Sequence, residues 1–350
     1  MTNNVFVDGI ITALQSSGGV SVCFEKLLYA LKHSGLDCTY LNYGNNLHIN
    51  MDKYSNTEKF DIIQRKKFPP LPLERYCKVS ATGSGVFHSS YYRLPRNRNR
   101  RVVTTVHDFV YEHYISGIAS KLHSYQKKNA ILNSDVIICV SDNTRRDLLQ
   151  FIPEAHGKDI RVVYNGVSGA YYPLVGYKKD KQTILFVGSR VSYKQFQTLV
   201  DILHYIPGFT LTIVGGGKLT KSEKNLLESK MTDRFIKHDF VNDAKLNELY
   251  NNAFCLVYPS TYEGFGIPVL EAMKAGCPVI AMNKSSIPEI SGDAALLLDD
   301  LNRESLIKAL QDLRRDDFRA KLINFGHENV KRFSWKRNTE QILSIYKELL

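Results

Sequence analysis

Two glutamates in one glycine-containing segment could bind a ligand that carries hydroxyl groups. Glu263 follows a predicted apolar strand at residues 255–258, and Glu271 lies in the helix predicted to begin near Ile267. One carboxylate accepts two hydrogen bonds at once, so each can hold a pair of sugar or ribose hydroxyls. The predicted helix start would also bring backbone N–H groups together, which favours an anion; they belong to Phe265, Gly266 and Ile267. The segment therefore predicts a site for an anionic ligand with several hydroxyls.

Basic residues are the second candidate feature. The chain has a formal net charge of +11, and its densest basic cluster is Arg93, Arg96, Arg98, Arg100 and Arg101. Such a cluster attracts phosphate groups or an anionic membrane surface. A solvated basic loop is the alternative interpretation. No nucleic-acid recognition motif accompanies the charge, which argues against a nucleic-acid partner.

The composition indicates a folded globular protein. Hydrophobic residues make up 43% of the 350 residues and charged residues 23%, which excludes a disordered or fibrous chain. No apolar run approaches the roughly 18 residues of a membrane span, and the N-terminus shows no signal-peptide pattern, so we expect a cytoplasmic protein. The six cysteines form no CxxC pair. We expect free thiols in a reducing compartment and no zinc site.

The elements that position these residues alternate between short apolar strands and helical segments. The first series has predicted strands near residues 5–7, 86–88, 102–106, 135–140 and 161–164. The alternation restarts after residues 166–177, with strands near 183–187, 210–214, 255–258 and 279–282. This pattern predicts parallel sheets with right-handed crossovers. We therefore expect an α/β protein of two doubly wound domains that bind ligands at the carboxyl ends of their strands.

The segment around the two glutamates resembles the donor-binding motif of the retaining glycosyltransferases of family 4. Seven residues separate Glu263 from Glu271, and the first stands in the run Glu-Gly-Phe-Gly-Ile-Pro. Further stretches are similar to family motifs: Gly18-Gly19, Val106-His107-Asp108, residues 138–141, residues 164–167, residues 186–190 with Lys194, and residues 333–335. The similarity covers most of the chain and is weakest between residues 45 and 80.

The resemblance implies the GT-B fold, in which two Rossmann-like domains face a central cleft. Residues 1–168 would form the acceptor-binding domain, and residues 169–333 would form the nucleotide-sugar-binding domain. Residues 334–350 would form a helix that crosses back to pack on the N-terminal domain.

The family's diphosphate-binding roles carry over to matching positions. Arg190 and Lys194 would neutralise the diphosphate of a nucleotide sugar, while Gly18 and Gly19 would let backbone N–H groups approach it closely. The four-residue spacing from Arg190 to Lys194 is shorter than in many members. The chain has no Asp-x-Asp motif, so the resemblance implies that these cations and a helix dipole act without a metal ion or other cofactor.

The resemblance also assigns the hydroxyl, sugar and base contacts. Glu271 would hold the ribose hydroxyls, and Glu263 would hold hydroxyls of the donor sugar. His107 would contact the transferred sugar, and Val241 would border the nucleobase. The donor-binding segment beside Glu263 is completed by Gly264, Phe265, Gly266 and Ile267. The expected catalytic residues are His107, Glu263, Arg190 and Lys194.

The implied reaction transfers a hexose with retention at the anomeric carbon. Negative charge develops on the leaving diphosphate, so stabilising that group is the main catalytic effect. Family members are described by a front-face route in which the leaving phosphate takes the acceptor's proton. We expect a GDP-sugar such as GDP-mannose as donor. The run at residues 87–93 is reminiscent of bacterial surface-polysaccharide transferases, which implies O-antigen or capsule assembly on a polyprenyl-diphosphate-linked glycan. Together with the arginine cluster, this predicts an enzyme on the inner face of the cytoplasmic membrane.

Other functions stay open at this point. An oxidoreductase would need G-x-G-x-x-G after a strand, whereas residues 215–217 lack the third spaced glycine. A UDP-sugar-dependent transferase with a soluble acceptor belongs to the same enzyme class. A non-catalytic basic binder of polyanions or membranes would show neither hydrolysis nor transfer of the donor.

Overall fold

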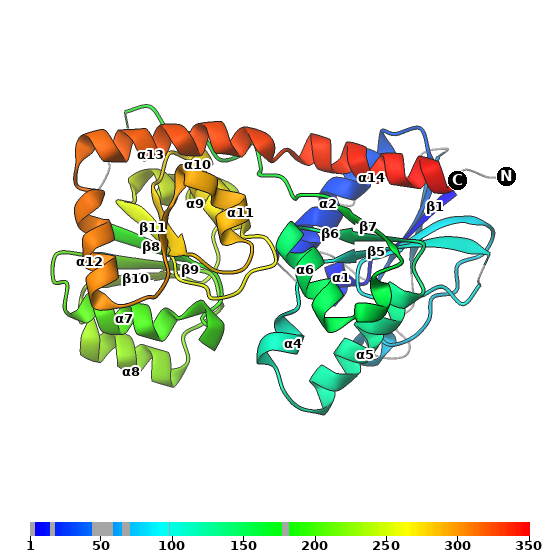
Figure 1. Ribbon diagram of the computed structural model, residues 1–350, viewed down its shortest axis with the longest axis horizontal. Coiled ribbons are helices and arrows are strands. Elements are labelled where there is room, and N and C mark those ends of the chain that lie inside the picture. Colours follow the sequence, from blue (N-terminus) through cyan, green and yellow to red (C-terminus); the bar gives the residue numbers. More distant parts are fainter. Residues whose placement is uncertain (1–3, 15–17, 44–58, 65–70, 98, 177–181) are drawn as a thin grey trace. The chain divides into compact units, whose positions relative to one another are not determined.

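The chain folds into two compact units. The computed structural model (Figure 1) describes residues 4–14, 18–43, 59–64, 71–97, 99–176 and 182–350. One unit comprises residues 1–165 together with residues 335–350, and the other comprises residues 166–334. The sequence predicted the unit boundaries at 168/169 and 333/334, close to these positions.

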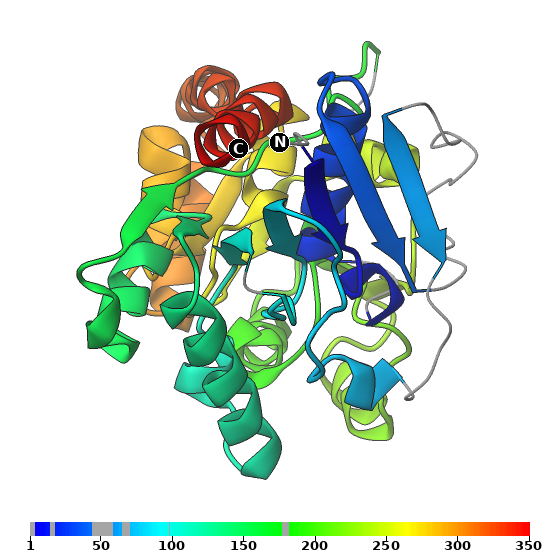
Figure 2. The ribbon, with the colours of Figure 1, turned by 90° about the vertical axis from the view of Figure 1, so that its right-hand side faces the viewer.

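The N-terminal unit is built on a seven-stranded sheet with the order β3-β2-β1-β4-β5-β6-β7. All neighbouring strands pair in parallel, and the arrows of β1, β2 and β3 run side by side in one direction in Figure 2. The strands are β1 (Asn4–Asp8), β2 (Asp37–Asn42), β3 (Phe60–Gln64), β4 (Gly85–Ser89), β5 (Arg100–Val106), β6 (Val136–Cys139) and β7 (Asp159–Val162).

Helices cover this sheet, and the last helix of the chain is one of them. The helices are α1 (Ile11–Leu14), α2 (Gly19–Lys32), α3 (Leu71–Glu74), α4 (Val110–Tyr114), α5 (Ile118–Leu132), α6 (Asp142–Phe151) and α14 (Trp335–Leu349). Helix α14 packs against α2 and β4. Its buried face carries Ile342, Ile345 and Tyr346 at helical spacing, and these side chains join the core of the N-terminal unit. Helix α14, although it is the last helix in the sequence, is therefore part of the N-terminal unit.

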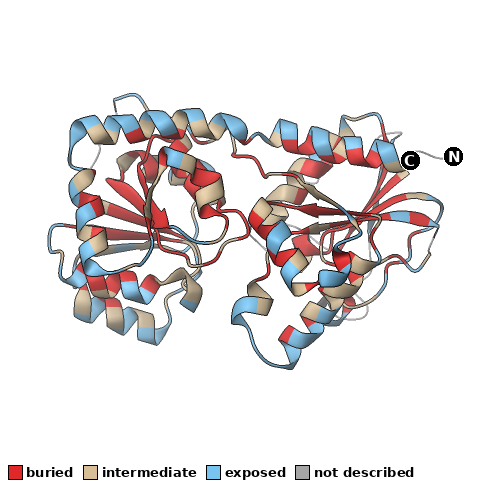
Figure 3. Cartoon of the chain, in the orientation of Figure 1, coloured by how far each residue is buried: buried red, intermediate tan, exposed pale blue. Residues whose placement is uncertain are grey.

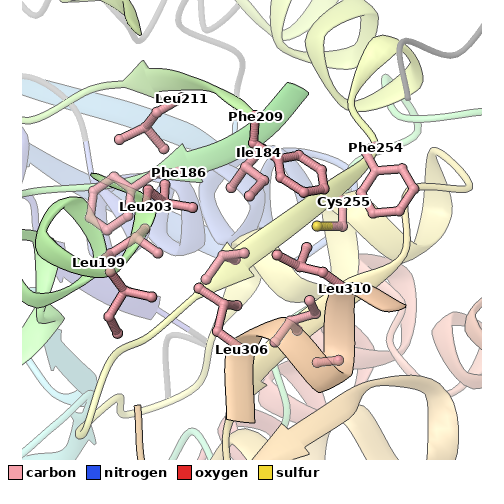
Figure 4. Close-up of a cluster of buried hydrophobic side chains, with 14 of the residues drawn as sticks. Ile184, Phe186, Leu199, Leu203, Phe209, Leu211, Phe254, Cys255, Leu306 and Leu310 are labelled. Carbon is pink, nitrogen blue, oxygen red and sulfur yellow. The ribbon is translucent and has the colours of Figure 1, made fainter. Parts of the chain in front are cut away.

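The C-terminal unit has a six-stranded parallel sheet with the order β10-β9-β8-β11-β12-β13. Its strands are β8 (Thr183–Val187), β9 (Thr210–Val214), β10 (Phe235–His238), β11 (Cys255–Tyr258), β12 (Val279–Met282) and β13 (Leu296–Leu298). Its helices are α7 (Phe196–His204), α8 (Lys221–Lys230), α9 (Asp243–Asn252), α10 (Ile267–Lys274), α11 (Ile287–Ser291), α12 (Arg303–Asp312) and α13 (Asp316–Asn329). Figure 4 shows part of the core that these elements enclose.

Both sheets have buried strand interiors, which appear red in Figure 3, as expected for parallel sheets covered on both faces. In each sheet the strand order reverses once, between β1 and β4 in the N-terminal unit and between β8 and β11 in the C-terminal unit. Loops that leave the carboxyl ends of strands at such a reversal diverge and create a binding crevice. The residues after β8 and β11 include Lys194 and Glu263, so the fold brings these two predicted residues to one place.

Three general expectations can be compared with the described residues. All six cysteines are free thiols, and four of them are buried. No helix in the described ranges is long and apolar enough to cross a membrane. Within the same ranges, no three His, Cys, Asp or Glu side chains gather in a way that could hold a metal ion.

Candidate functional site

Lys194 and Glu263 form an ion pair at the carboxyl edge of the C-terminal sheet. Lys194 Nζ lies 2.5 Å from Glu263 Oε1 and also donates to the Tyr258 hydroxyl at 3.4 Å. Their side chains are 12% and 14% exposed. The structure thus joins the residue predicted to bind the diphosphate to the one predicted to bind the donor sugar. Each of the two groups has one charged partner in this pair and retains some access to solvent.

Two serines hold the backbone of Glu263. Ser285 Oγ accepts from the Glu263 N–H at 2.9 Å, and Ser286 Oγ donates to the carbonyls of Glu263 and Phe265 at 2.9 Å each. Ser285 adopts a φ of 52°, a strained conformation for a residue with a side chain, and Ser286 is fully buried. The sequence analysis missed both serines; the available signal was their position directly after the apolar strand β12.

The helix that follows Glu263 begins as the sequence predicted. Gly266 is the N-cap of α10 with φ 107° and ψ 47°, and Pro268 lies in the first turn. A Cβ at Gly266 would lie 2.7 Å from Ile287 Cδ1, so both the backbone conformation and the space require glycine. No side chain of the described residues caps this helix start. The positive end of the α10 dipole therefore lies beside Glu263 without a side-chain cap among the described residues.

Arg190 has a different environment from Lys194. Its Nε donates to Glu223 Oε1 at 2.8 Å, and its terminal nitrogens donate to the carbonyls of Gly215 at 2.8 Å and Lys218 at 3.0 Å. The side chain is 3% exposed. Gly216, with φ 72°, makes room for the guanidinium, which a Cβ there would overlap. Arg190 thus braces the loop after β9, and its diphosphate contact stays a prediction.

Glu271 lies on α10 among tyrosine hydroxyls. The Tyr250 hydroxyl donates to Glu271 Oε2 at 3.0 Å, and the Tyr171 hydroxyl lies near the same carboxyl group but donates to Asp243 Oδ1 at 3.2 Å. Burial raises the pKa of Glu271 to about 7, against the opposing effect of the Tyr250 hydrogen bond. Neither tyrosine was predicted, because nothing in the local sequence connects residues so distant along the chain.

The predicted base-bordering residue, Val241, lies just after the edge strand β10. It is half-buried and precedes Asn242, whose side chain caps α9. The next residue, Asp243, accepts a hydrogen bond from Tyr171 at 3.2 Å, and Tyr171 in turn contacts Glu271. Asp243, two residues after Val241, and the predicted ribose-binding carboxylate of Glu271 therefore both lie beside the Tyr171 hydroxyl.

In the N-terminal unit, Gly18 and Gly19 stand at the start of α2. Gly18 is the N-cap, with an extended backbone and no side chain to cap the helix, and Gly19 is the first helical residue. The preceding residues 15–17 lie outside the described residues. The placement agrees with backbone N–H groups that open a helix after β1, and the diphosphate contact stays a prediction.

His107 follows β5 and borders a small pocket. Its Nε2 is buried and has no hydrogen-bond partner among the described residues. The pocket is also lined by Cys23, Phe24, His88 and Asn165. Burial, and secondarily the charge of Lys127, lower the pKa of His107 to about 4, so the ring is neutral near pH 7. A neutral imidazole with an unpaired nitrogen can donate a hydrogen bond to a sugar hydroxyl or accept one from it, depending on its tautomer.

The sequence analysis missed two residues near His107: Lys127, which binds the backbone after it, and His88, which lines the same pocket. Lys127 on α5 is fully buried, and its Nζ donates to the Asp108 carbonyl at 2.9 Å and to Glu112 Oε2 at 2.8 Å. His88 contacts the Tyr346 hydroxyl of α14 at 2.5 Å through Nδ1. Lys127 fixes the backbone after His107, although in the sequence it looks like a surface lysine of an amphipathic helix.

The prediction that the five arginines form a basic surface is wrong for two of them, Arg93 and Arg100. Arg93 is 1% exposed and pairs with Asp8 at 3.1 Å and Glu74 at 2.9 Å. Arg100 is 4% exposed and donates to backbone carbonyls of Thr82 and Val86. Neither side chain can meet an acceptor or a membrane, because each is used to satisfy buried carboxylates or carbonyls. Of the rest, Arg96 is exposed, Arg101 is exposed and pairs with Asp135, and Arg98 lies outside the described residues.

Comparison with protein families identifies the chain. A family described as "Glycosyl transferases group 1" matches residues 175–349, which is half of the chain. This protein belongs to the glycosyl transferases group 1 family. A second family, "Glycosyltransferase Family 4", matches residues 17–169, almost all of which belong to the N-terminal unit. The resemblance to family 4 glycosyltransferases drawn from Glu263 and Glu271 is therefore confirmed.

Individual relatives agree with this assignment. The glycosyltransferase is 28% identical over 285 residues to O-antigen chain mannosyltransferase B of Escherichia coli, covering 75% of this chain and 74% of that protein. It is 27% identical over 259 residues to alpha-maltose-1-phosphate synthase of Mycolicibacterium smegmatis, covering 65% and 67%. The solved structure of sucrose-phosphate synthase from Thermosynechococcus elongatus aligns with a TM-score of 0.80 at 20% identity, covering 99% of this chain and 98% of that one. The expected GT-B fold, with two Rossmann-like domains, is confirmed.

Proposed function

We propose that this glycosyltransferase moves a hexose, with retention and without a metal ion, from a GDP-sugar such as GDP-mannose to a polyprenyl-diphosphate-linked glycan. The pathway is assembly of a bacterial surface polysaccharide, O-antigen or capsule. The observation that carries the proposal is the grouping of Lys194 and Glu263 beside the start of α10. A cation, a carboxylate and a helix dipole at one strand edge suit a ligand that combines a diphosphate with sugar hydroxyls.

Electrostatics explain how this grouping promotes transfer. As the bond from the anomeric carbon to the diphosphate oxygen breaks, negative charge grows on the leaving phosphate. Lys194 Nζ is already desolvated enough to interact strongly, because its side chain is 12% exposed. When Lys194 pairs with the phosphate instead of Glu263, the Glu263 carboxylate becomes available to accept hydrogen bonds from hydroxyls of the donor sugar. One preorganised donor of this kind typically contributes about 3 kcal/mol to transition-state stabilisation.

The contacts of Glu263 support the proposed retention of configuration at the anomeric carbon. A double displacement needs a carboxylate close beneath the anomeric carbon. Glu263 is held at its backbone by Ser285 and Ser286 and at its side chain by Lys194, an arrangement suited to binding rather than attack. We therefore propose a front-face reaction in which the leaving phosphate accepts the proton of the acceptor hydroxyl.

The proposed donor and pathway are supported by the relatives. O-antigen chain mannosyltransferase B is similar over three quarters of this chain, and its name indicates a mannose donor and a surface glycan. The alpha-maltose-1-phosphate synthase relative, similar over 65% of the chain, supports a soluble acceptor as the second candidate.

An exposed apolar face supports the proposed contact with the inner face of the cytoplasmic membrane. Ile118 is 87% exposed, Leu122 44% and Tyr125 70%, and their spacing places them on one face of α5. We call these three residues the α5 apolar face. Solvent-exposed apolar side chains on an amphipathic helix bind the headgroup boundary of a bilayer. This face takes the place of the arginine cluster, of which Arg93 and Arg100 are buried.

A thermal-shift panel with GDP, UDP and ADP, each with and without EDTA, tests the donor site. A ligand at 100 times its Kd adds about 2.7 kcal/mol, which raises Tm by a few degrees. We expect a shift with GDP that EDTA leaves unchanged and that Lys194→Ala abolishes. A shift with UDP alone would replace the proposed donor, and no shift with any nucleotide would favour the non-catalytic polyanion binder.

Vesicle flotation tests the membrane contact. We expect the protein to float with vesicles containing phosphatidylglycerol, and the double variant Ile118→Ser/Tyr125→Ser to stay at the bottom of the gradient. Ile236→Ser is the matched control, because Ile236 is 51% exposed on the C-terminal unit. Equal flotation of all three proteins would contradict the role of the α5 apolar face.

A further inference from the structure

Arg75 is a half-buried arginine that has no counter-charge among the described residues. It directly follows α3 and forms no ion pair in the part of the chain that the structure describes. Its Nε is buried without a hydrogen-bond partner, and its Nη2 donates to the hydroxyl of the adjacent Tyr76. Arg93, in the same unit, pairs with two carboxylates. An arginine with unused donors in a half-buried place can complete its hydrogen bonds with an anion from outside the chain.

Tyrosine rings hold the Arg75 guanidinium in place. Its central carbon lies 4.7 Å from the ring centroid of Tyr76 and 5.2 Å from that of Tyr91. The ring of Tyr111 stacks on His123 at 3.8 Å, and Tyr91 meets the same histidine edge-on at 5.7 Å. A guanidinium held over aromatic faces keeps its N–H edge for bidentate binding of a phosphate. We call Arg75, Tyr76, Tyr91 and Tyr111, all half-buried, the Arg75 cluster.

The Arg75 cluster lies at the carboxyl edge of the N-terminal sheet, beside α5. Tyr91 follows β4 and Tyr111 follows β5, and these two strands are neighbours. Tyr111 belongs to α4, which packs against α5 (Figure 1). On α5, Gln126 donates to the Arg75 carbonyl at 2.5 Å. Gln126 is one helical turn after Leu122 of the α5 apolar face, so the cluster adjoins the surface proposed to contact the membrane.

We propose that the Arg75 cluster binds the diphosphate that joins the polyprenyl chain to the acceptor glycan. Arg75 supplies the charge and the paired N–H donors, and the tyrosine rings pack against the first isoprene units. The inference rests on the proposed function, since it assumes a lipid-linked acceptor. It assigns the acceptor's diphosphate to residues outside the donor site. Arg75 also lies within residues 45–80, where the resemblance to family motifs is weakest, so no family role carries over to it.

Calorimetry with three small probes tests this binding. The probes are farnesyl diphosphate, inorganic pyrophosphate and glucose 1-phosphate; the last represents a soluble phosphate-bearing acceptor. Each Kd is measured for the wild-type protein and in a Lys194→Ala background, which removes the cation of the proposed donor site. In both, we expect farnesyl diphosphate to bind about tenfold more tightly than either other probe, because only it offers a diphosphate together with an apolar chain.

Variants of Arg75 and Tyr91 identify the residues responsible. Arg75→Gln should weaken farnesyl diphosphate binding about tenfold, and Arg75→Lys about threefold, because lysine keeps the charge but lacks the planar fork. Tyr91→Ser should bring the affinity for farnesyl diphosphate toward that for pyrophosphate. Arg161→Gln is the matched control, expected to leave the affinity unchanged. Arg161 is a half-buried arginine of the same unit that pairs with Asp159 and Glu348.

A measurement on the wild-type protein keeps the inference testable if a variant fails to fold. Phenylglyoxal modifies accessible arginines, and mass spectrometry of the digested protein gives the rate at each position. Saturating farnesyl diphosphate should slow the modification of Arg75 and leave that of Arg161 unchanged. Equal rates at Arg75 with and without farnesyl diphosphate would overturn the inference.

The outcomes separate this inference from the proposed function. Equal affinity of the wild-type protein and Arg75→Gln for farnesyl diphosphate overturns the inference and leaves the donor site standing. Tighter binding of glucose 1-phosphate than of farnesyl diphosphate overturns the lipid source of the phosphate and favours the soluble acceptor. The absence of a thermal shift with any nucleotide overturns the donor part of the proposed function, whatever farnesyl diphosphate does.

Discussion

The ion-pair clusters at the two sheet edges differ in how completely they are enclosed. In the N-terminal unit, Arg93, Asp8 and Glu74 have side chains that are 0–3% exposed. In the C-terminal unit, Lys194 and Glu263 are 12% and 14% exposed and have one charged partner each. A sealed arginine with two carboxylates cannot release either without leaving a buried charge unpaired. A pair that reaches solvent at a strand reversal can exchange its partner for a ligand, so similar chemistry supports structure in one unit and the proposed donor binding in the other.

The largest effect is expected from breaking the sealed cluster. Arg93→Met should lower the free energy of unfolding by about 3–5 kcal/mol, because Asp8 and Glu74 stay buried without their counter-charge. Urea unfolding at pH 7.5 measures this. Arg101→Met is the control: its side chain is 64% exposed and pairs with Asp135, so it should cost at most about 1 kcal/mol. If Arg93→Met lowered the free energy of unfolding by less than about 1 kcal/mol, the two ion-pair clusters would not differ in the way described.

The Lys194–Glu263 pair should show the reverse behaviour, with a large effect on activity and a smaller effect on stability. Lys194→Ala should reduce the rate of sugar transfer by about 10²–10³-fold, while the free energy of unfolding falls by less than for Arg93→Met, because Glu263 retains access to solvent. Steady-state kinetics with the donor found by thermal shift, together with urea unfolding, give both quantities. Lys237→Ala provides the matched control, since Lys237 is 10% exposed and pairs with Asp239 at 3.0 Å. Equal kinetic losses in the two variants would show that Lys194 has no special role.

The two units should also respond oppositely to acid. Burial lowers the pKa of His88 to about 3 and that of His107 to about 4, so their contribution to stability is present above about pH 6.5 and is lost as the pH falls toward those values. Burial raises the pKa of Glu271 to about 7, so its contribution is present below about pH 4.5 and is lost as the pH rises through 7.

Glu271→Gln isolates the second contribution. Relative to wild type, this variant should have a higher Tm at pH 8, where the ionised carboxylate is buried, and a smaller difference at pH 5. Thermal unfolding at both pH values measures it. Glu289→Gln, on α11 in the same unit, controls for the change of side-chain type. A Tm difference for Glu271→Gln that does not change with pH would contradict the raised pKa of this carboxyl group.

The smallest effect is expected at Gln195, next to Lys194. Gln195 adopts φ 49° and ψ 30°, a left-handed conformation that costs a residue with a side chain about 1–2 kcal/mol. Gln195→Gly should therefore stabilise the protein by up to about 1 kcal/mol, after the entropy that glycine adds to the unfolded chain. Gln195→Ala should bring no such gain, because it keeps the strain. Urea unfolding of both variants distinguishes relief of strain from loss of the glutamine side chain.

Local patterns predicted the part of the site that depends on neighbours in the chain. The strand before Glu263, the glycine at position 266 and the helix after it lie within one short segment, and the structure shows all three. The alternation of strands and helices likewise predicted two parallel sheets. Such features depend on hydrophobic periodicity and on backbone preferences, which a single stretch of sequence displays.

Side chains that meet across the fold were not predictable in this way. Arg190 and Glu223 come from different strand–helix units, as do Tyr171 and Glu271. The arginines between residues 93 and 101 looked alike in sequence, yet Arg93 is sealed among carboxylates and Arg101 is exposed. Lys127 resembles a surface lysine in sequence, but it lies under the loop that carries His107.

The sequence by itself determined the fold class and the residue types at the strand reversal of the C-terminal unit, because these follow from local periodicity and spacing, and the resemblance of its motifs to known ones indicated the enzyme family. Only the tertiary structure decided which charges are sealed and which can exchange partners. Burial depends on what packs around a side chain from distant segments, as Asp8 and Glu74 do around Arg93 and as Glu263 and Tyr258 do around Lys194. The difference between a structural ion pair and a binding residue is therefore a property of the folded chain.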